Sequence, residues 1–340
     1  METLYAGVDL HSNNNVVVII DKDETVVFRR KLSNGLDMVL THLDPFKERL
    51  DGIVVESTYN WYWLVDGLQE QGYPVHLANT GAIEQYSGLK YGNDESDARW
   101  LANLLRLNIL PEGYIYPKEE RPVRDLMRKR MGLVRKRTAC ILSAKNLMVR
   151  NTGRTPSANW VKRVSDEEVD SLFEDPFLAL PVKSTLNVIR HLDQEIAALE
   201  KAALERVKLR DDFKCLLTAT GIGNILALTI MLETGDIGRF PTVGDYASYA
   251  RCVGSKRVSN GKQKGKGNTK CGNAYLAWAF AEAAAFATRY DKAIQSYYQR
   301  KLARASHPMV ARKAVAHKLA RACYHMLRDQ TPFDVKRAFT

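Results

Sequence analysis

Apolar and polar residues alternate with two different periods along this chain. In the first 35 residues, β-branched runs are separated by Asn, Asp and Lys residues that favour turns, a pattern typical of short strands. Three such runs follow one another and predict a meander of three strands. They cover residues 4–11 (LYAGVDLH), 14–23 (NNVVVIIDKD) and 25–32 (TVVFRRKL).

Helical and extended patterns alternate after the meander. Two more strands are predicted by short apolar runs, at residues 52–57 (GIVVES) and 73–79 (YPVHLAN). Three helices are predicted at residues about 35–50, 60–72 and 93–110. Asn93 or Asp94 is placed to cap the last of them. This order predicts an α/β domain with a mixed sheet over residues 1–110.

The rest of the chain has a helical pattern, in two predicted regions, 115–210 and 211–330. A long helix runs from Arg121 to Arg150 and ends near the Gly and Pro of TGRTPSANW. In a later helix, apolar residues recur at the 3-4 spacing of a coiled-coil seam. These are Ile189, Leu192, Ile196, Leu199 and Ala203. The seam predicts a homo-oligomer, from dimer to tetramer, and a helix packed within its own domain is the alternative.

Charge divides the chain into an acidic and a basic part. The 340 residues carry a formal net charge of +11. Residues 1–110 hold 9 Lys and Arg against 16 Asp and Glu, a balance of −7, which leaves 41 against 23, or +18, for residues 111–340. Such a basic excess attracts polyanions, because neutralised phosphates release counterions. Nucleic acid is therefore the expected partner.

Membrane and zinc-binding classes are disfavoured by the composition. No apolar segment reaches the ~20 residues of a spanning helix. The first residues lack the basic and apolar layout of a signal peptide, so we expect a cytoplasmic protein that binds no membrane. The five cysteines contain no CxxC pair and the seven histidines have no zinc-ligand spacing. Reduced thiols are expected.

Four carboxylates in the acidic part are candidates for a metal site. Asp9 lies within an apolar strand and Glu56 ends another, positions where an uncompensated carboxylate is costly to bury. Asp94 and Asp97 lie three residues apart and share one face at the start of a helix. Convergent carboxylates suit Mg²⁺, and two such ions can flank a phosphodiester. The alternatives are that Asp94 only caps its helix and that Asp97 pairs with an arginine.

Two segments of the basic part are candidates for phosphate contacts. Residues Arg121 to Arg150 hold ten Lys and Arg, Arg128 and Arg135 among them, against the single carboxylate of Asp125. The alternative for such a helix is a solvated charged face. The Gly-x-Gly turn of Gly221 and Gly223 enters a helix, where backbone N–H groups can approach a phosphate. An ordinary tight turn is the alternative.

The segment RVSNGKQKGKGNTK, residues 257–270, interleaves Gly with Lys and contains Ser259. Mobile backbone and compact charges suit a sugar-phosphate chain. The expected nucleic-acid contacts here are Lys256, Arg257, Lys262, Lys264, Lys266 and Lys270. A serine hydroxyl is a weak nucleophile that needs a base, a lowered pKa or a metal, and no histidine lies in the segment. Read by itself, the pattern favours Ser259 as a turn residue before Asn260-Gly261.

Taken together, these motifs resemble the DEDD-type insertion-sequence transposases, a family that includes the Piv DNA invertase. The resemblance rests on GVDLH in the meander, the acid that ends the fourth strand and the D-x-x-D-A-x-x-L-A helix. It continues in ATGIGNILALTIMLETGDIGRF, in the serine segment with its flanks and in VARKAVAHKLARACYHML. It covers residues 3–107 and about 212–328, whereas the middle matches only as a generic coiled coil.

The resemblance implies a RuvC-like ribonuclease-H fold for residues 1–110 and a mainly helical C-terminal transposase domain with a helix-hairpin-helix-like element. Its metal ligands map to Asp9, Glu56, Asp94 and Asp97, with Mg²⁺ or Mn²⁺ as the cofactor. Its nucleophile maps to Ser259. Asn260 departs from the more common Gly, mildly, because Asn also tolerates positive φ.

The implied activity is excision and integration of an insertion sequence by metal-dependent cleavage and rejoining of DNA through a covalent serine–DNA intermediate. The implied partners are donor DNA, target DNA and a non-coding bridge RNA whose base pairing carries specificity. One alternative is a RuvC-like hydrolytic nuclease or junction resolvase, in which Ser259 is passive. The other is a non-catalytic nucleic-acid-binding scaffold.

Overall fold

The computed structural model describes residues 2–83, 93–254, 257–265 and 271–339. The chain divides into two compact units, Met1–Lys118 and Glu119–Thr340, and each is described by itself. The middle helices belong to the second unit, and the division into three regions stays a prediction.

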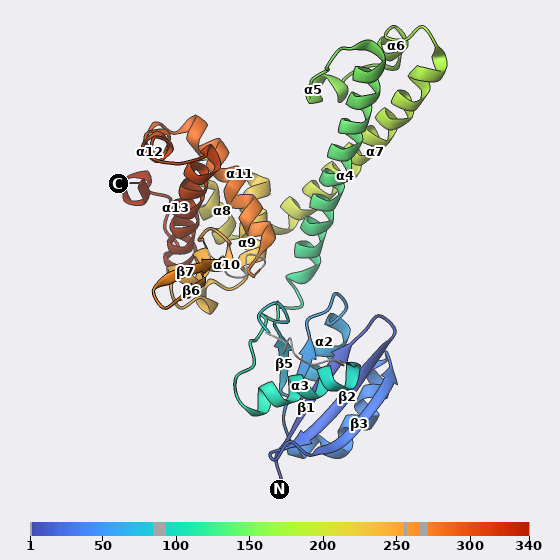
Figure 1. Cartoon of the computed structure of the whole chain (residues 1–340), viewed down its shortest axis with the longest axis vertical. Helices are drawn as coiled ribbons and strands as arrows, with labels where there is room; N and C mark the ends of the chain where they lie inside the picture. Colours follow the sequence, from blue (N-terminus) through green and yellow to red (C-terminus); the bar gives the residue numbers. More distant parts are fainter. Residues whose placement is uncertain (1, 84–92, 255–256, 266–270, 340) are drawn as a thin grey trace. The chain divides into compact units, whose positions relative to one another are not determined.

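The first unit is a five-stranded mixed sheet with helices on both faces (Figure 1). Its strands are β1 (Leu4–Leu10), β2 (Asn14–Asp21), β3 (Val26–Ser33), β4 (Leu50–Glu56) and β5 (Val75–Ala78). Its helices are α1 (Leu36–Leu43), the 3-10 helix η1 (Asp44–Arg49), α2 (Tyr62–Glu70) and α3 (Asp94–Arg106). The strand order is β3-β2-β1-β4-β5, with an antiparallel meander and then parallel β4 and β5. The predicted elements are confirmed.

Strict alternation along the strands divides the side chains between two layers. Val17 and Ile19 of β2 face the core shared with α1 and α2, whereas Val16 and Val18 face α3. On β1, the same alternation sends Val8 into the larger core and places Gly7 and Asp9 on the α3 side. The α3 face is therefore the one that carries the acidic residue.

The second unit begins with a helical hairpin. Helices α4 (Arg121–Thr152) and α7 (Pro176–Val207) run side by side, with the short helices α5 (Ala158–Val161) and α6 (Asp166–Asp170) at their far end (Figure 1). Gly153, at φ 68°, ends α4 in the left-handed conformation that glycine favours.

The seam residues of α7 pack within this chain. Ile189 is buried in a core with Ile141 of α4, and Ala203 is buried with Met127 of α4. Ion pairs that include Arg130 with Glu200, at 2.6 Å, also join the two helices. The 3-4 spacing thus has an intrachain partner in α4, as in the alternative interpretation, and the homo-oligomer stays a prediction.

The remaining elements form a mainly helical body around one core. They are α8 (Asp211–Leu217), α9 (Asn224–Thr234), the 3-10 helix η2 (Ile237–Arg239), α10 (Val243–Tyr249), β6 (Arg257–Ser259), β7 (Lys262–Gly265), α11 (Ala274–Tyr290), α12 (Lys292–Leu302), α13 (Pro308–Asp329) and α14 (Val335–Phe339). Its centre holds the buried rings of Tyr246, Phe280 and Tyr324. Within the described part of the chain, none of the helices combines the length and apolar character needed to cross a bilayer.

Candidate active site

Strand pairing brings Asp9 and Glu56 together. Val8 of β1 lies opposite Val55 of the parallel strand β4, so the next residue on each strand is its acid. The two carboxyl groups lie close enough for Asp9 to raise the pKa of Glu56. Asp9 is 4% exposed, which confirms that the sequence places a carboxylate inside an apolar strand.

Helix α3, which packs on this face of the sheet, contributes Asp94 and Asp97. Asn93 is its N-cap, with a reciprocal capping box to Ser96, so Asp94 is the first helical residue rather than the cap. The helix sits so close to β1 that a Cβ on Gly7 would lie 1.9 Å from the carbonyl oxygen of Ala98. A glycine at this position therefore sets how near α3 comes to Asp9.

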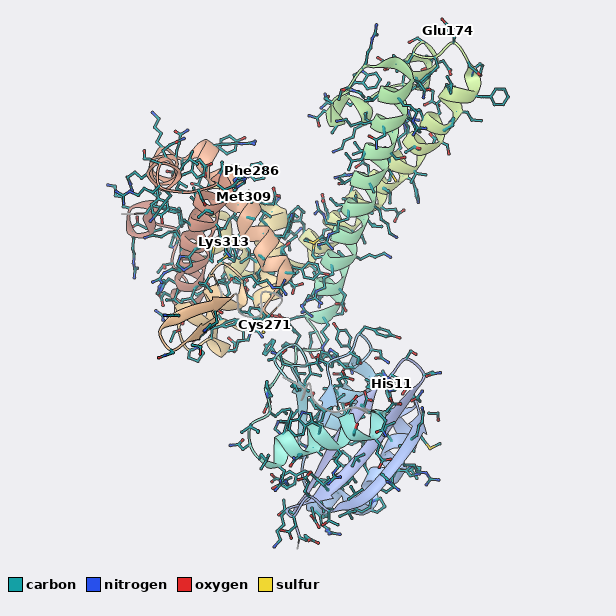
Figure 2. The ribbon with its side chains drawn as sticks, in the orientation of Figure 1. His11, Glu174, Cys271, Phe286, Met309 and Lys313 are labelled. Carbon is teal, nitrogen blue, oxygen red and sulfur yellow. The ribbon has the colours of Figure 1, made fainter. Side chains whose placement is uncertain are left out.

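A histidine that the sequence analysis did not single out also belongs to the site. His11 Nε2 lies 3.3 Å from Asp9 Oδ2 and 3.3 Å from Asp94 Oδ2 (Figure 2). Its backbone carbonyl accepts hydrogen bonds from the side chains of Asn34 and Asn60, both at 2.9 Å, which fixes the end of β1. The available signal was its place two residues after Asp9, on the same face of the strand.

Crowding of the carboxylates changes their protonation. Burial, followed by the hydrogen bond and charge of Asp9, raises the pKa of Glu56 to about 7. Burial and the charges of Asp9 and Asp94 raise the pKa of Asp97. The cluster therefore holds negative charge at a cost, and a cation would relieve it.

The acids surround a cavity of about 410 Å³ on the α3 side of the sheet. Its lining includes Asp9, Glu56 and Asp97, with Trp100 and Leu101 of α3 as its apolar wall. Asp94 does not line this cavity, and joins the cluster through His11. Three of the four predicted acids thus share one space, and the fourth lies beside it.

The donors suit a divalent cation. Asp9, His11 and Asp94 offer one ligand atom each within 4.8 Å of one another. His11 Nε2 is buried without a well-formed hydrogen bond, as expected of an atom whose natural partner is a ligand or a proton. Asp9 belongs both to this set and to the cavity set with Glu56 and Asp97.

In the second unit, Ser259 ends one strand of a two-stranded hairpin rather than lying in a mobile loop. Asn260 and Gly261 form its turn at φ 49° and 70°, the left-handed pair of a type I′ turn. Ser259 is exposed, with Lys262 paired opposite it and Lys264 exposed nearby. Of the other predicted contacts, only the backbone of Arg257 is described. Lys256, Lys266 and Lys270 lie outside the described residues.

The flanks of this hairpin are tied to each other. Arg251, just after α10, donates to the carbonyl oxygens of Cys271 at 3.1 Å and of Gly272 at 2.8 Å (Figure 2). Asn273 donates its backbone N–H to the carbonyl oxygen of Tyr249 at 2.6 Å. These hydrogen bonds therefore hold the two ends of the serine segment next to each other.

A buried ion network explains one of the predicted nucleic-acid contacts differently. Arg128 makes a bidentate pair with Glu233 at 2.6 and 2.8 Å, and Arg124 and Asn273 also contact this carboxylate. Glu233 is 2% exposed, and these partners lower its pKa against the effect of burial. We therefore assign Arg128 to the internal structure of this unit. Arg135 is exposed on α4, with its guanidinium against Met131 Sδ, and its contact with nucleic acid stays a prediction.

The two turn glycines have different environments. Gly221 adopts φ +91°, and a Cβ there would lie 2.5 Å from the carbonyl oxygen of Ala283, so packing against α11 already requires glycine. Gly223 precedes α9 and faces open space beside a surface cavity that includes Phe286 (Figure 2). Packing therefore requires a glycine at position 221 but not at position 223.

Comparisons with known proteins match both units. Residues 6–150 match a family model described as a DEDD transposase of IS110, and residues 213–299 match the transposase IS116/IS110/IS902 family. A probable family 20 transposase of Pseudomonas aeruginosa is 25% identical over 279 residues, 79% of this chain and 80% of the relative. A putative mini-circle transposase for IS117 of Streptomyces coelicolor is 22% identical, over 99% of this chain and 97% of the relative. With the acidic cluster in the first matched segment and the serine hairpin in the second, the chain belongs to the IS110 family of transposases.

Proposed function

We propose that this transposase excises and integrates an insertion sequence by cleaving and rejoining DNA through a covalent bond to Ser259. The observation that carries the proposal is the convergence of Asp9, Glu56 and Asp97 on one cavity, with Asp94 and His11 beside it. The family match supports the substrate class, and the exposure of Ser259 on a lysine-bearing hairpin supports its role.

Each group in this scheme has a distinct task. Asp9, Glu56, Asp94 and Asp97 would hold Mg²⁺ or Mn²⁺, which supplies charge stabilisation at the phosphodiester when bound. Ser259 Oγ forms a bond to phosphorus as one P–O bond of the strand breaks and its oxygen leaves as a hydroxyl. The number of phosphodiester bonds is unchanged, so the released hydroxyl of another strand can reverse the step. Lys262 and Lys264 lie near enough in sequence to oppose the charge of the phosphate.

The proposed partners are donor and target DNA and a non-coding bridge RNA. The balance of +18 over residues 111–340 supports a polyanionic partner, and the RNA rests on the resemblance to this family. A homo-oligomer remains part of the proposal, because strand exchange joins several DNA ends. The buried residues of the α7 seam are used within the chain, so a second copy would bind elsewhere.

The test combines protein, Mg²⁺, RNA from the flank of the element and end-labelled DNA on a denaturing gel. Wild-type protein should give a protein–DNA adduct. Ser259→Ala should lose it, Asp9→Asn should lose both adduct and cleavage, and the matched exposed-serine variant Ser296→Ala should keep both. Cleavage without an adduct in wild-type and Ser259→Ala alike would favour the hydrolytic nuclease. Indifference to Asp9→Asn would favour the scaffold.

A further inference from the structure

A further cavity, of about 200 Å³, lies between α13 and the C-terminal helix α14. Lys318, Arg321 and His325 line it from one face of α13, at spacings of three and four residues. Arg337 of α14 lines its other side. Figure 1 shows the C-terminal helix beside α13, and both belong to the second unit, so the cavity is internal to one compact body.

Among the described residues, carboxylates do not pair with the lysine and the two arginines of this cavity. Asp334 is the acid that lines the cavity, and its Oδ1 accepts backbone N–H groups at the start of α14, at 2.9 and 3.2 Å. The nearby Asp329 is paired with Arg328 at 2.8 Å, and its Oδ2 also lies 3.9 Å from His325 Nδ1. Among the described residues, no ion pair connects Lys318, Arg321 or Arg337 to a carboxylate. Positive charge therefore accumulates around a concave surface.

Neighbouring groups add to the positive charge around this cavity and respond to it. The ammonium groups of Lys301 and Lys318 lie 5.4 and 5.9 Å from the ring centre of Tyr297, so α12 adds to the same basic face. The pKa of His325 is lowered, first by burial and then by the charge of Arg328, with Arg337 and Arg321 contributing. The pKa of His317 is lowered by burial and by Arg321 and Lys318.

We propose that the cavity between α13 and α14 binds a backbone phosphate of a nucleic acid. Two arginine guanidinium groups from different helices offer the forked donors that phosphate oxygens accept, and Lys318 adds a point charge. The site is separate from Ser259 and does not depend on the proposed covalent chemistry. DNA and RNA share the phosphodiester, and the experiment distinguishes them.

The first arm of the test follows His325 by NMR in the histidine-labelled full chain, with inorganic phosphate as the probe. Phosphate should shift the His325 ring signal and raise its pKa, since a bound anion opposes the surrounding cations. R321Q/R337Q should lose this response, and Arg163→Gln, an exposed arginine of the same unit, should keep it. A His325 signal that phosphate leaves unchanged, or an equal response in R321Q/R337Q, overturns the proposal.

The second arm measures affinity for a short DNA duplex and for an RNA duplex of the same sequence. Loss of one phosphate contact should reduce the slope of log affinity against log salt by about 0.9 for DNA, and weaken binding roughly 8-fold at about 0.1 M salt. The nucleic acid that shows this loss in R321Q/R337Q, and not in Arg163→Gln, is the ligand. A response to inorganic phosphate with no loss for either duplex means an adventitious ion only, and overturns the proposal.

A folding control separates loss of the phosphate site from loss of the fold in both experiments. Arg337 is exposed on the last short helix, so Arg337→Gln alone should leave the unfolding midpoint unchanged and still halve the phosphate response or more. Replacing both arginines by lysine keeps the charge and should retain most of the affinity. If the lysine variant, folded as the wild type, loses affinity as fully as R321Q/R337Q, the forked donors rather than the charge carry the contact, and the phosphate assignment still holds. If neither the lysine variant nor R337Q loses any affinity, the assignment of this cavity as a phosphate site fails.

Discussion

Gly7→Ala tests whether the packing of α3 on β1 sets the geometry of the acidic cluster. A Cβ at this position would lie 1.9 Å from the carbonyl oxygen of Ala98 and 2.8 Å from the backbone nitrogen of Ala102. Both neighbours are backbone, so no side chain can rotate away, and contacts under 3.0 Å essentially never occur. Helix α3 must retreat by about 1 Å or more, carrying Asp94 and Asp97 away from Asp9.

Two magnitudes follow from that displacement. Overpacking should cost about 1–3 kcal/mol of unfolding free energy. Misplacing catalytic groups by about 1 Å should lower the rate of Mg²⁺-dependent strand cleavage about 100-fold. Urea unfolding and single-turnover cleavage measure the two effects, at protein concentrations where the variant remains folded.

Gly35→Ala is the matched control within the same unit. Gly35 has extended backbone at φ 173°, and a Cβ there would approach no atom closer than 4.0 Å. Because Gly35 is the N-cap of α1, where Ala is less favourable than Gly, the variant should lose at most about 1 kcal/mol of stability and cleave within about twofold of the wild-type rate. If Gly7→Ala is folded and cleaves at the wild-type rate, the close approach of α3 is not what positions the acids, and the reasoning is wrong.

Three other predictions concern stability. Gly132→Ala, in the interior of α4 with open space around the new Cβ, should stabilise the chain by about 0.5–1 kcal/mol in urea unfolding; a loss would contradict the open environment. Glu233→Ala should cost about 3–5 kcal/mol, because it removes the buried carboxylate that compensates the guanidinium charges of Arg124 and Arg128, and a cost below about 1 kcal/mol would refute the network. Because the pKa of Glu56 is raised from 4.5 to about 7, the metal-free folded protein keeps a proton that the unfolded chain releases. The contribution of Glu56 to the free energy of unfolding is fully present below about pH 4.5 and is lost as the pH rises to about 7. Glu56→Gln should therefore show a smaller loss of stability over this pH range, and parallel stability–pH profiles for the variant and the wild type would contradict the raised pKa.

Much of the first unit follows from local pattern. Alternation along β1 and β2 assigns each residue to a face, and the acids at the ends of adjacent parallel strands then meet without further information. His11 was missed because a search limited to carboxylates ignores the next residue on the same strand face. Its contact with Asp94 also depends on how closely α3 approaches Gly7, which no local pattern states.

The second unit shows where pattern is ambiguous. The 3-4 spacing around Ile196 fits a partner helix in another chain or in the same one, and only the path of the chain makes α4 the partner. The charge of Arg128 resembles a phosphate contact until Glu233, 105 residues away, is placed beside it. At Ser259, the Asn-Gly pair predicts the turn that the structure has, whereas the two short strands that flank it were not predicted, because Gly and Lys dominate the segment.

The covalent role of Ser259 is the central claim, and mapping the DNA-linked peptide tests it most directly. After reaction with DNA and Mg²⁺, trypsin cleavage at Arg257 and Lys262 releases residues 258–262, in which Ser259 is the sole hydroxyl-bearing side chain. Mass spectrometry after nuclease digestion should find the nucleotide mass on this peptide, with the bond at Ser259. A nucleotide attached to any other peptide, or cleaved DNA with this peptide unmodified throughout the reaction, would contradict the account.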